Sequence, residues 1–259
     1  MAHSRLHSRL VLAAGLVLGG AGIAQAAVVR VSEDAFQAGS GLISNSEVPL
    51  GTINPIFAPG DYGGGDASPT VTSGGYFVGQ SLSIDPNADC PGAAASACVV
   101  GDPTGALSID PDSPDVFTAD DTSTPTTPTL SGSPLFNGPI ALLFSEDQFG
   151  VGFTAGFFNA VGSTGITAFA RDGSLLGTVV NEGMGVEFLG LVSQEADIAG
   201  VFLDLVGSEP AGFVIDNIRF GVQGQVIPEP LPNPVPLPAG LPLLAAGLGG
   251  LALLRSRRT

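Results

Sequence analysis

Short apolar runs separated by turn-forming residues dominate the chain between residues 27 and 226. The runs are rich in Val, Ile, Phe and Thr, with Gly, Pro, Asp and Asn between them, and no segment keeps a 3.6-residue apolar period. We predict strands at residues 28–31, 76–84, 140–144, 150–158, 166–171, 175–180, 186–192, 200–206 and 213–220. Turn signals recur about every 8 to 12 residues, which favours an all-β, jelly-roll-like β-sandwich over a parallel sheet.

Residues 85–134 differ from the rest of this region, because Pro, Asp, Ser and Thr are dense there and little is available to bury. Loops of this length are uncommon inside a compact domain. We interpret the stretch as an acidic excursion from the sandwich domain of residues 27–226, with residues 122–128 as its most linker-like part. Asp172-Gly173 lies between two apolar runs and predicts a hairpin turn, because both residue types tolerate positive φ.

The first 26 residues have the pattern of a secretory signal peptide. Arg5 and Arg9 precede an apolar run at residues 10–22, and Ala24-Gln25-Ala26 forms a small-x-small cleavage site. We expect a signal helix at residues 1–26 that engages the Sec export machinery and is then removed. The alternative is an uncleaved N-terminal anchor.

Export would place the two cysteines, Cys90 and Cys98, in an oxidising compartment. A pair at this spacing predicts a local disulfide that closes one loop, rather than a redox centre, which normally uses the closer Cys-x-x-Cys spacing. By chain entropy, so short a loop stabilises the fold by about 2–3 kcal/mol.

Residues 227–259 have three parts in order: a Pro-rich stretch, an apolar segment at residues 241–254 and a basic tail, Arg255-Ser256-Arg257-Arg258. A helix over the apolar segment would reach about 21 Å, which is short of a hydrocarbon core of about 30 Å. The arginines should hold its end in the cytoplasm and leave the acidic domain outside.

This order closely resembles the PEP-CTERM sorting signals of Gram-negative bacteria, in their VPLPA subtype, here Val235-Pro236-Leu237-Pro238-Ala239-Gly240. The resemblance implies a transient hold in the inner membrane, cleavage near the motif by an exosortase-type enzyme, and delivery to the cell surface or an extracellular polysaccharide matrix. A Pro228-Glu229-Pro230 also occurs, but it lies before the apolar segment instead of abutting it. The alternative is a permanent tail anchor.

Composition and charge exclude several classes of function. The formal net charge is −16, and all 8 basic residues are arginine, so binding of nucleic acid is not expected. The two histidines, His3 and His7, precede the apolar run of the signal peptide, so the mature chain would have no imidazole for nucleophilic catalysis or for a zinc or iron site. We therefore expect no enzymatic activity.

Asp216 is the carboxylate that stands out. In the predicted strand at residues 213–220, two-residue alternation places it on the same face as Val214, Ile218 and Phe220, which we expect to be the core face. A carboxylate there needs a partner, and calcium is a candidate because it binds carboxylate and carbonyl oxygens. The alternatives are that it caps loop amides, or that a bulge turns it outward.

The run Phe213-Val214-Ile215-Asp216-Asn217-Ile218-Arg219-Phe220 resembles the closing strand of jelly-roll modules in PEP-CTERM proteins and, more distantly, of MAM-type and carbohydrate-binding domains. In some such modules an acid of this strand and one near the first strand share a calcium ion. The resemblance implies Asp216 with Glu33 or Asp34 here. Trp, the usual sugar-stacking residue of carbohydrate-binding modules, is absent.

Other acidic groups give weaker signals. Residues 85–89 begin like an EF-hand loop, but Cys90 stands where that loop needs Gly, so an EF-hand is rejected. The acids of residues 110–121 are interpreted as a solvated loop. Glu146-Asp147 could in principle supply the acid and the nucleophile of a glycosidase, but a chain with 24 acidic residues offers many such pairs.

We expect an exported, non-catalytic protein of the cell surface or extracellular matrix with a structural or adhesive role. The alternative is a carbohydrate-binding or carbohydrate-active protein of the polysaccharide matrix, and a calcium-dependent adhesin is a third reading.

Overall fold

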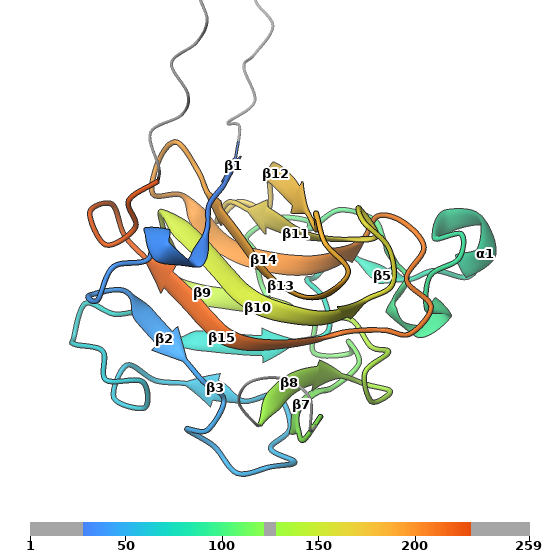
Figure 1. Ribbon diagram of the computed structural model, residues 1–259, viewed down its shortest axis with the longest axis horizontal. Helices are drawn as coiled ribbons and strands as arrows, with labels where there is room; N and C mark the ends of the chain where they lie inside the picture. The colour runs from blue at the N-terminus through green and yellow to red at the C-terminus, as the bar shows by residue number, and fades with distance from the viewer. Residues whose placement is uncertain (1–27, 122–127, 229–259) are drawn as a thin grey trace, which may run out of the picture.

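A computed structural model describes residues 28–121 and 128–228, which form two antiparallel sheets packed as a sandwich (Figure 1). One sheet has the order β1 (Val29–Arg30), β13 (Gly185–Val192), β10 (Gly150–Phe158), β15 (Val214–Gly221), β8 (Thr129–Gly132) and β7 (Val116–Ala119), with β2 (Gly41–Ile43) also paired to β15. The other has the order β12 (Leu175–Val180), β11 (Thr164–Phe169), β14 (Ile198–Leu205), β9 (Ala141–Gln148), β4 (Val71–Gly74) and β3 (Ile56–Phe57). The sandwich is the fold class that the sequence predicts.

Three short helical turns and one small hairpin complete the described chain. The helical turns are η1 (Glu33–Ala35), α1 (Pro86–Asp89) and η2 (Ala95–Ala97), and the hairpin pairs β5 (Ser81–Leu82) with β6 (Val99–Val100). No helix within residues 28–121 and 128–228 is long and apolar enough to cross a membrane. The predicted signal helix and the sorting motif at residues 235–240 lie outside the described residues.

The predicted strands at the two ends of the described chain and across residues 140–220 are confirmed, with shifts of a few residues at their ends. The predicted turn is confirmed as well. Gly173 has φ 86° and joins β11 to β12, with the backbone N–H of Ala170 donating to the carbonyl of Ser174 at 2.9 Å.

The strand predicted over residues 76–84 is largely wrong, because only Ser81–Leu82 is extended and paired. A turn interrupts the apolar run. The backbone N–H of Gln80 donates to the carbonyl of Phe77 at 3.0 Å, and Gly79 takes φ 101°. Alternation alone does not reveal this turn, since Gly79 is the one turn-forming residue within the run Tyr76 to Gln80.

The interpretation of residues 85–134 as an excursion with little to bury is also wrong in part. Strands β7 and β8 pair with each other and extend the seven-stranded sheet beyond β15. Val116 and Leu130 are completely buried in the core. These strands are short and flanked by Pro and Thr, so composition alone does not predict them.

The main core lies between the inner faces of the two sheets. Phe144 of β9 and Phe220 of β15 approach across it with ring centroids 5.3 Å apart. Each fully buried side chain of this size contributes about 1.5–3 kcal/mol through removal from water. Ile166, Leu203, Val151 and Phe153 occupy the same cluster.

A second, smaller cluster lies on the outer face of the six-stranded sheet. Thr167 pairs with Phe202, and Ile166 of the central core pairs with Leu203, so Thr167 and Phe202 point away from the central core. The chain between Tyr76 and Ile109 covers this outer face, with Phe77 and Phe169 in edge-to-face contact at 5.7 Å. The six-stranded sheet is therefore covered on both sides.

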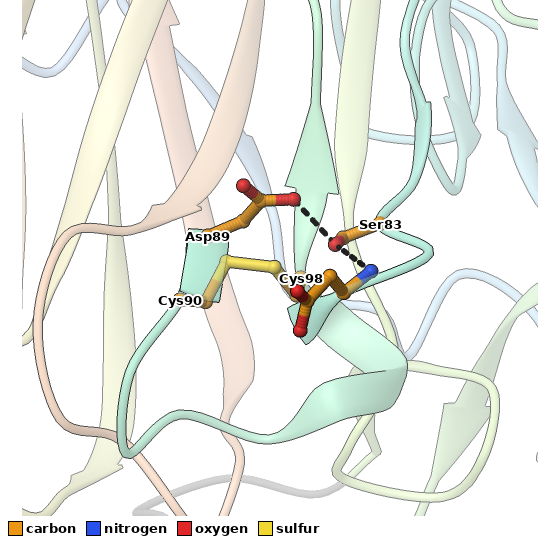
Figure 2. Close-up of a disulfide and its surroundings, with 5 residues drawn as sticks. Ser83, Asp89, Cys90 and Cys98 are labelled. Carbon is orange, nitrogen blue, oxygen red and sulfur yellow. Dashed lines mark hydrogen bonds between the residues drawn. A yellow bond between two sulfur atoms is a disulfide. The ribbon is translucent and has the colours of Figure 1, made fainter. Parts of the chain in front are cut away.

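The predicted disulfide between Cys90 and Cys98 is confirmed (Figure 2). Its loop packs against one end of the sandwich, where Ala94 N–H donates to the Glu209 carbonyl at 2.8 Å. The Glu209 side chain is completely buried there and accepts hydrogen bonds from the backbone N–H of Asn159 at 2.9 Å and from Ser163 Oγ at 2.6 Å. The disulfide thus closes a loop that caps the fold.

Candidate functional site

Asp216 lies on β15 beside a β-bulge. Ile215 pairs with Ala155, Asp216 with Thr154, and Phe220 with Val151, but one extra residue of β15 stands between the Asp216 and Arg219 pairs. Asn217 takes φ 49° at this point. Ile215 and Phe220 both belong to the core cluster, so Asp216 lies on the opposite face, with Thr154. The prediction that Asp216 shares the core face with Ile218 and Phe220 is wrong, because the bulge turns it to the opposite face of the sheet.

Asp216 is nevertheless completely buried, and so is Asn45, which follows β2. Asn45 Nδ2 lies 3.4 Å from Asp216 Oδ1, and Asn217 donates from its backbone N–H to the same oxygen at 2.7 Å. Asn45 Oδ1 is buried without a hydrogen-bond partner among the described residues. The Asp216 carboxylate and the Asn45 carboxamide are therefore buried side by side, with the amide nitrogen toward the carboxylate and the amide oxygen left without a partner among the described residues.

The structure places Glu33 and Asp34 in η1, where Glu33 Oε1 accepts from Arg219 Nε at 2.9 Å and Nη2 at 2.8 Å. Asp34 is exposed. In the described part of the chain, no group of three or more His, Cys, Asp or Glu side chains is placed to hold a metal ion. The oxygens of Asp216 and Asn45 are donors of the kind that calcium prefers, whereas Glu33 is held by an arginine. Calcium at Asp216, Glu33 and Asp34 stays a prediction.

The remaining acids that the sequence singles out are dispersed. Asp89 accepts from Ser83 Oγ at 2.6 Å, next to the disulfide (Figure 2). Asp115 accepts from Asn54 Nδ2 at 2.8 Å, and Asp147 forms an ion pair with Arg171 at 2.5 Å. Each of these contacts joins two neighbouring segments of the surface, which is a structural role.

Sequence reasoning missed a cavity on the outer face of the six-stranded sheet, with a volume of about 170 Å³. It lies between β6 on one side and β11, β12 and β14 on the other, and it is lined by Gln80, Val99, Val100, Gly101, Asp102, Thr167, Phe169, Leu175, Thr178, Phe202 and Asp204. The alternation of β14 places Phe202 and Asp204 on one face and could have indicated this acid.

Asp204 is the most deeply buried carboxylate of this cavity. Burial raises its pKa above the ordinary aspartate value, and a hydrogen bond from Thr167 only partly offsets this. Thr167 Oγ1 lies 3.4 Å from Asp204 Oδ2 and 2.7 Å from Thr178 Oγ1. The result is a row of oxygen atoms along one wall of the cavity, beside the apolar side chains of Phe169 and Phe202.

No protein-family model matches the chain, and no curated protein matches it.

Proposed function

We propose that the protein is an exported, non-catalytic component of the cell surface or extracellular matrix, processed at its C-terminal sorting signal, with a structural or adhesive role. The observation that carries this proposal is the ordered C-terminal end, in which Val235-Pro236-Leu237-Pro238-Ala239-Gly240 precedes an apolar segment and a basic tail. Its resemblance to sorting signals implies a transient stay in the inner membrane and recognition by an exosortase-type enzyme, and the signal peptide of residues 1–26 implies Sec-dependent export.

Two features of the fold support the proposal. The Cys90–Cys98 disulfide suits an oxidising compartment. The strand β1 and the segment after β15 lie at the same end of the sandwich, where Ile227 N–H donates to the Ala35 carbonyl at 2.8 Å (Figure 1). A domain attached at one end presents the rest of its surface to the medium, which suits a surface protein. We assign the sandwich to the jelly-roll type as part of the same proposal.

Substitution of the motif tests the sorting step. The full chain is expressed with and without an exosortase-type enzyme, and the variant Pro236→Ala/Pro238→Ala is compared with Pro228→Ala/Pro230→Ala as the matched control. We expect the first variant to remain in the membrane fraction and the control to be released like the wild type. Release of the first variant together with retention of the control would assign recognition to Pro228-Glu229-Pro230, and membrane retention of all three chains would favour a permanent anchor.

As a second candidate we propose glycan binding within that matrix, and the outer-face cavity favours it. Carboxylate, hydroxyl and carboxamide groups of Asp204, Thr178 and Gln80 meet Phe169 and Phe202 there. Polar groups that fix orientation beside an apolar wall are typical of small-molecule sites. Retention of the wild-type chain on immobilised polysaccharide, with loss on Asp204→Asn, tests this candidate.

Calcium belongs to the first proposal as a structural ion. It would be held by Asp216 with Glu33 or Asp34, and the buried amide oxygen of Asn45 is a further available donor. Bound calcium would neutralise the buried carboxylate and tie the segment after β2 to β15. An acidic domain of this kind meets the ion on export.

A further inference from the structure

The outer-face cavity holds an acid without a basic neighbour. None of its lining residues is Lys, Arg or His. The arginines of the described chain pair elsewhere: Arg30 with Glu182 and Glu187, Arg171 with Asp147, and Arg219 with Glu33. A partly buried carboxylate is stabilised most by a partner that brings positive charge and hydrogen-bond donors.

The oxygen atoms of the cavity suit a donor group. Asp204, Thr167 and Thr178 supply acceptors on three neighbouring strands, and Asp102 adds a second carboxylate at the rim. An ammonium group has three donors and no acceptor, so it matches this set better than a hydroxyl group does.

Gln80 adds a donor of its own. Its side chain is 8% exposed, and its Oε1 accepts from the Phe77 backbone N–H at 3.0 Å. Its Nε2 makes no hydrogen bond to the described residues, although the side chain lines the cavity. An amide nitrogen that lines the cavity and has no partner among the described residues can donate to a ligand that also carries an acceptor, such as a hydroxyl group.

Size and apolar walls complete the description of the ligand. A cavity of about 150 Å³ in another protein accommodates benzene, so 170 Å³ has room for one six-membered ring. Phe169, Phe202 and Val99 supply apolar surface for the C–H face of such a ring.

We propose that this cavity binds one amine-bearing sugar unit, with its ammonium group on Asp204 and Thr167 and a hydroxyl group on Gln80. This inference deepens the second proposed function and rests on it, because glycan binding supplies the sugar. It is independent of the sorting step.

Titration with three sugars of the same ring size tests the proposal. D-Glucosamine, D-glucose and N-acetyl-D-glucosamine are added to the full chain in a mild detergent at about pH 6, where an amine is protonated. Binding is followed by calorimetry and by changes in amide NMR shifts. We expect glucosamine to bind roughly tenfold to a hundredfold more tightly than the two neutral sugars, the factor that one charge-assisted hydrogen bond supplies.

Asp204→Asn removes the charge and keeps the shape, and it should bring glucosamine down to the affinity of glucose. Asp197→Asn is the matched control, since Asp197 is also half-buried but does not line the cavity. The control should bind like the wild type. If Asp204→Asn does not fold, the wild-type shift changes decide, and they must centre on Gly101, Thr178 and Asp204.

The possible failures are distinguishable. Equal affinity for glucose and glucosamine would overturn the amine-bearing ligand and leave glycan binding standing. The absence of binding by all three sugars would overturn both. Shift changes centred away from the cavity would overturn the assignment of the site.

Discussion

Asp216, which is buried, and Asp204, which is half-buried, show how the state of a carboxylate depends on its surroundings. Asp216 and Asp204 both lie on outer sheet faces, but Asp216 accepts a short hydrogen bond from the Asn217 backbone, whereas Asp204 has a 3.4 Å contact with Thr167 and a raised pKa caused mainly by burial. A raised carboxyl pKa means that the ionised form is less favourable in the folded chain than in the unfolded chain. The ionised Asp204 side chain therefore lowers the free energy of unfolding of the protein.

Asp204→Asn should stabilise the protein at neutral pH. The Asp204 pKa is raised, so below the ordinary aspartate value near 3.8 the acid is protonated in both states and the variant gains nothing. The gain appears as pH rises through the folded pKa and is complete above it. Thermal unfolding of both chains between acidic and neutral pH measures the difference.

Asp172→Asn is the control with the opposite sign. Hydrogen bonds from Ser174 lower the Asp172 pKa in the β11–β12 turn. Its stabilising effect is present above the ordinary pKa and is lost as pH falls through the folded pKa. Asp172→Asn should therefore unfold more readily at neutral pH. For Asp204→Asn the opposite is expected, and a loss of stability in that variant would contradict the description of the cavity.

Calcium is tested at Asp216. If calcium binds the native state alone, a concentration of 100 times Kd raises the free energy of unfolding by about 2.7 kcal/mol. We expect a higher unfolding temperature in calcium than in chelator, and Asp216→Asn should abolish the shift. Asp204→Asn serves as the matched control and should keep it. Equal unfolding temperatures in calcium and chelator would show that the protein itself satisfies Asp216.

The strands of this fold can be predicted from the sequence where apolar and polar residues alternate regularly. The prediction fails where the backbone departs from a two-residue period. The paired strands of residues 140–220 follow the sequence pattern closely. At β15 the two-residue period breaks, because Asn217 takes a positive φ that asparagine tolerates better than most residues. Only this Asp-Asn step hints at the bulge. Strands as short as β3 and β7 carry too few side chains for a period to show.

The position of the outer-face cavity cannot be predicted from the sequence, for a different reason. Its floor comes from β11, β12 and β14, whose facing residues can be read from alternation. Its other wall comes from Gln80 and residues 99–102, which lie about 65 to 125 positions earlier in the chain. Local periodicity does not relate two segments so far apart. The alternation of residues 76–84 also does not reveal the turn at Gly79 that positions Gln80.

The disulfide loop is tested by removing its bond. Cys90→Ala/Cys98→Ala should lower the free energy of unfolding by about 2.5 kcal/mol, the chain-entropy value for a loop of this length. Chemical denaturation of oxidised, reduced and variant chains gives the difference. Reduction should destabilise the wild type and leave the variant unchanged. Unchanged stability in the variant would mean that the contacts of Ala94 and Glu209 hold the cap without the bond.

At the scale of the whole molecule, the two ends of the described acidic sandwich lie together, and the proposed sorting signal follows one of them. The formal net charge of the full chain is −16, and this excess of negative charge disfavours contact with other copies and with anionic polymers and favours cationic or amine-bearing partners. The cavity with Asp204 agrees with this preference.

The mass of the protein recovered from the outside of the cell tests the central claim most directly. Intact-mass and terminal-peptide measurements on the released chain locate both ends. The account predicts a chain that begins at Ala27 and ends near residues 235–240, with one disulfide. Recovery of a surface protein that still carries the peptide of residues 241–259 would contradict the sorting step and identify a permanent anchor.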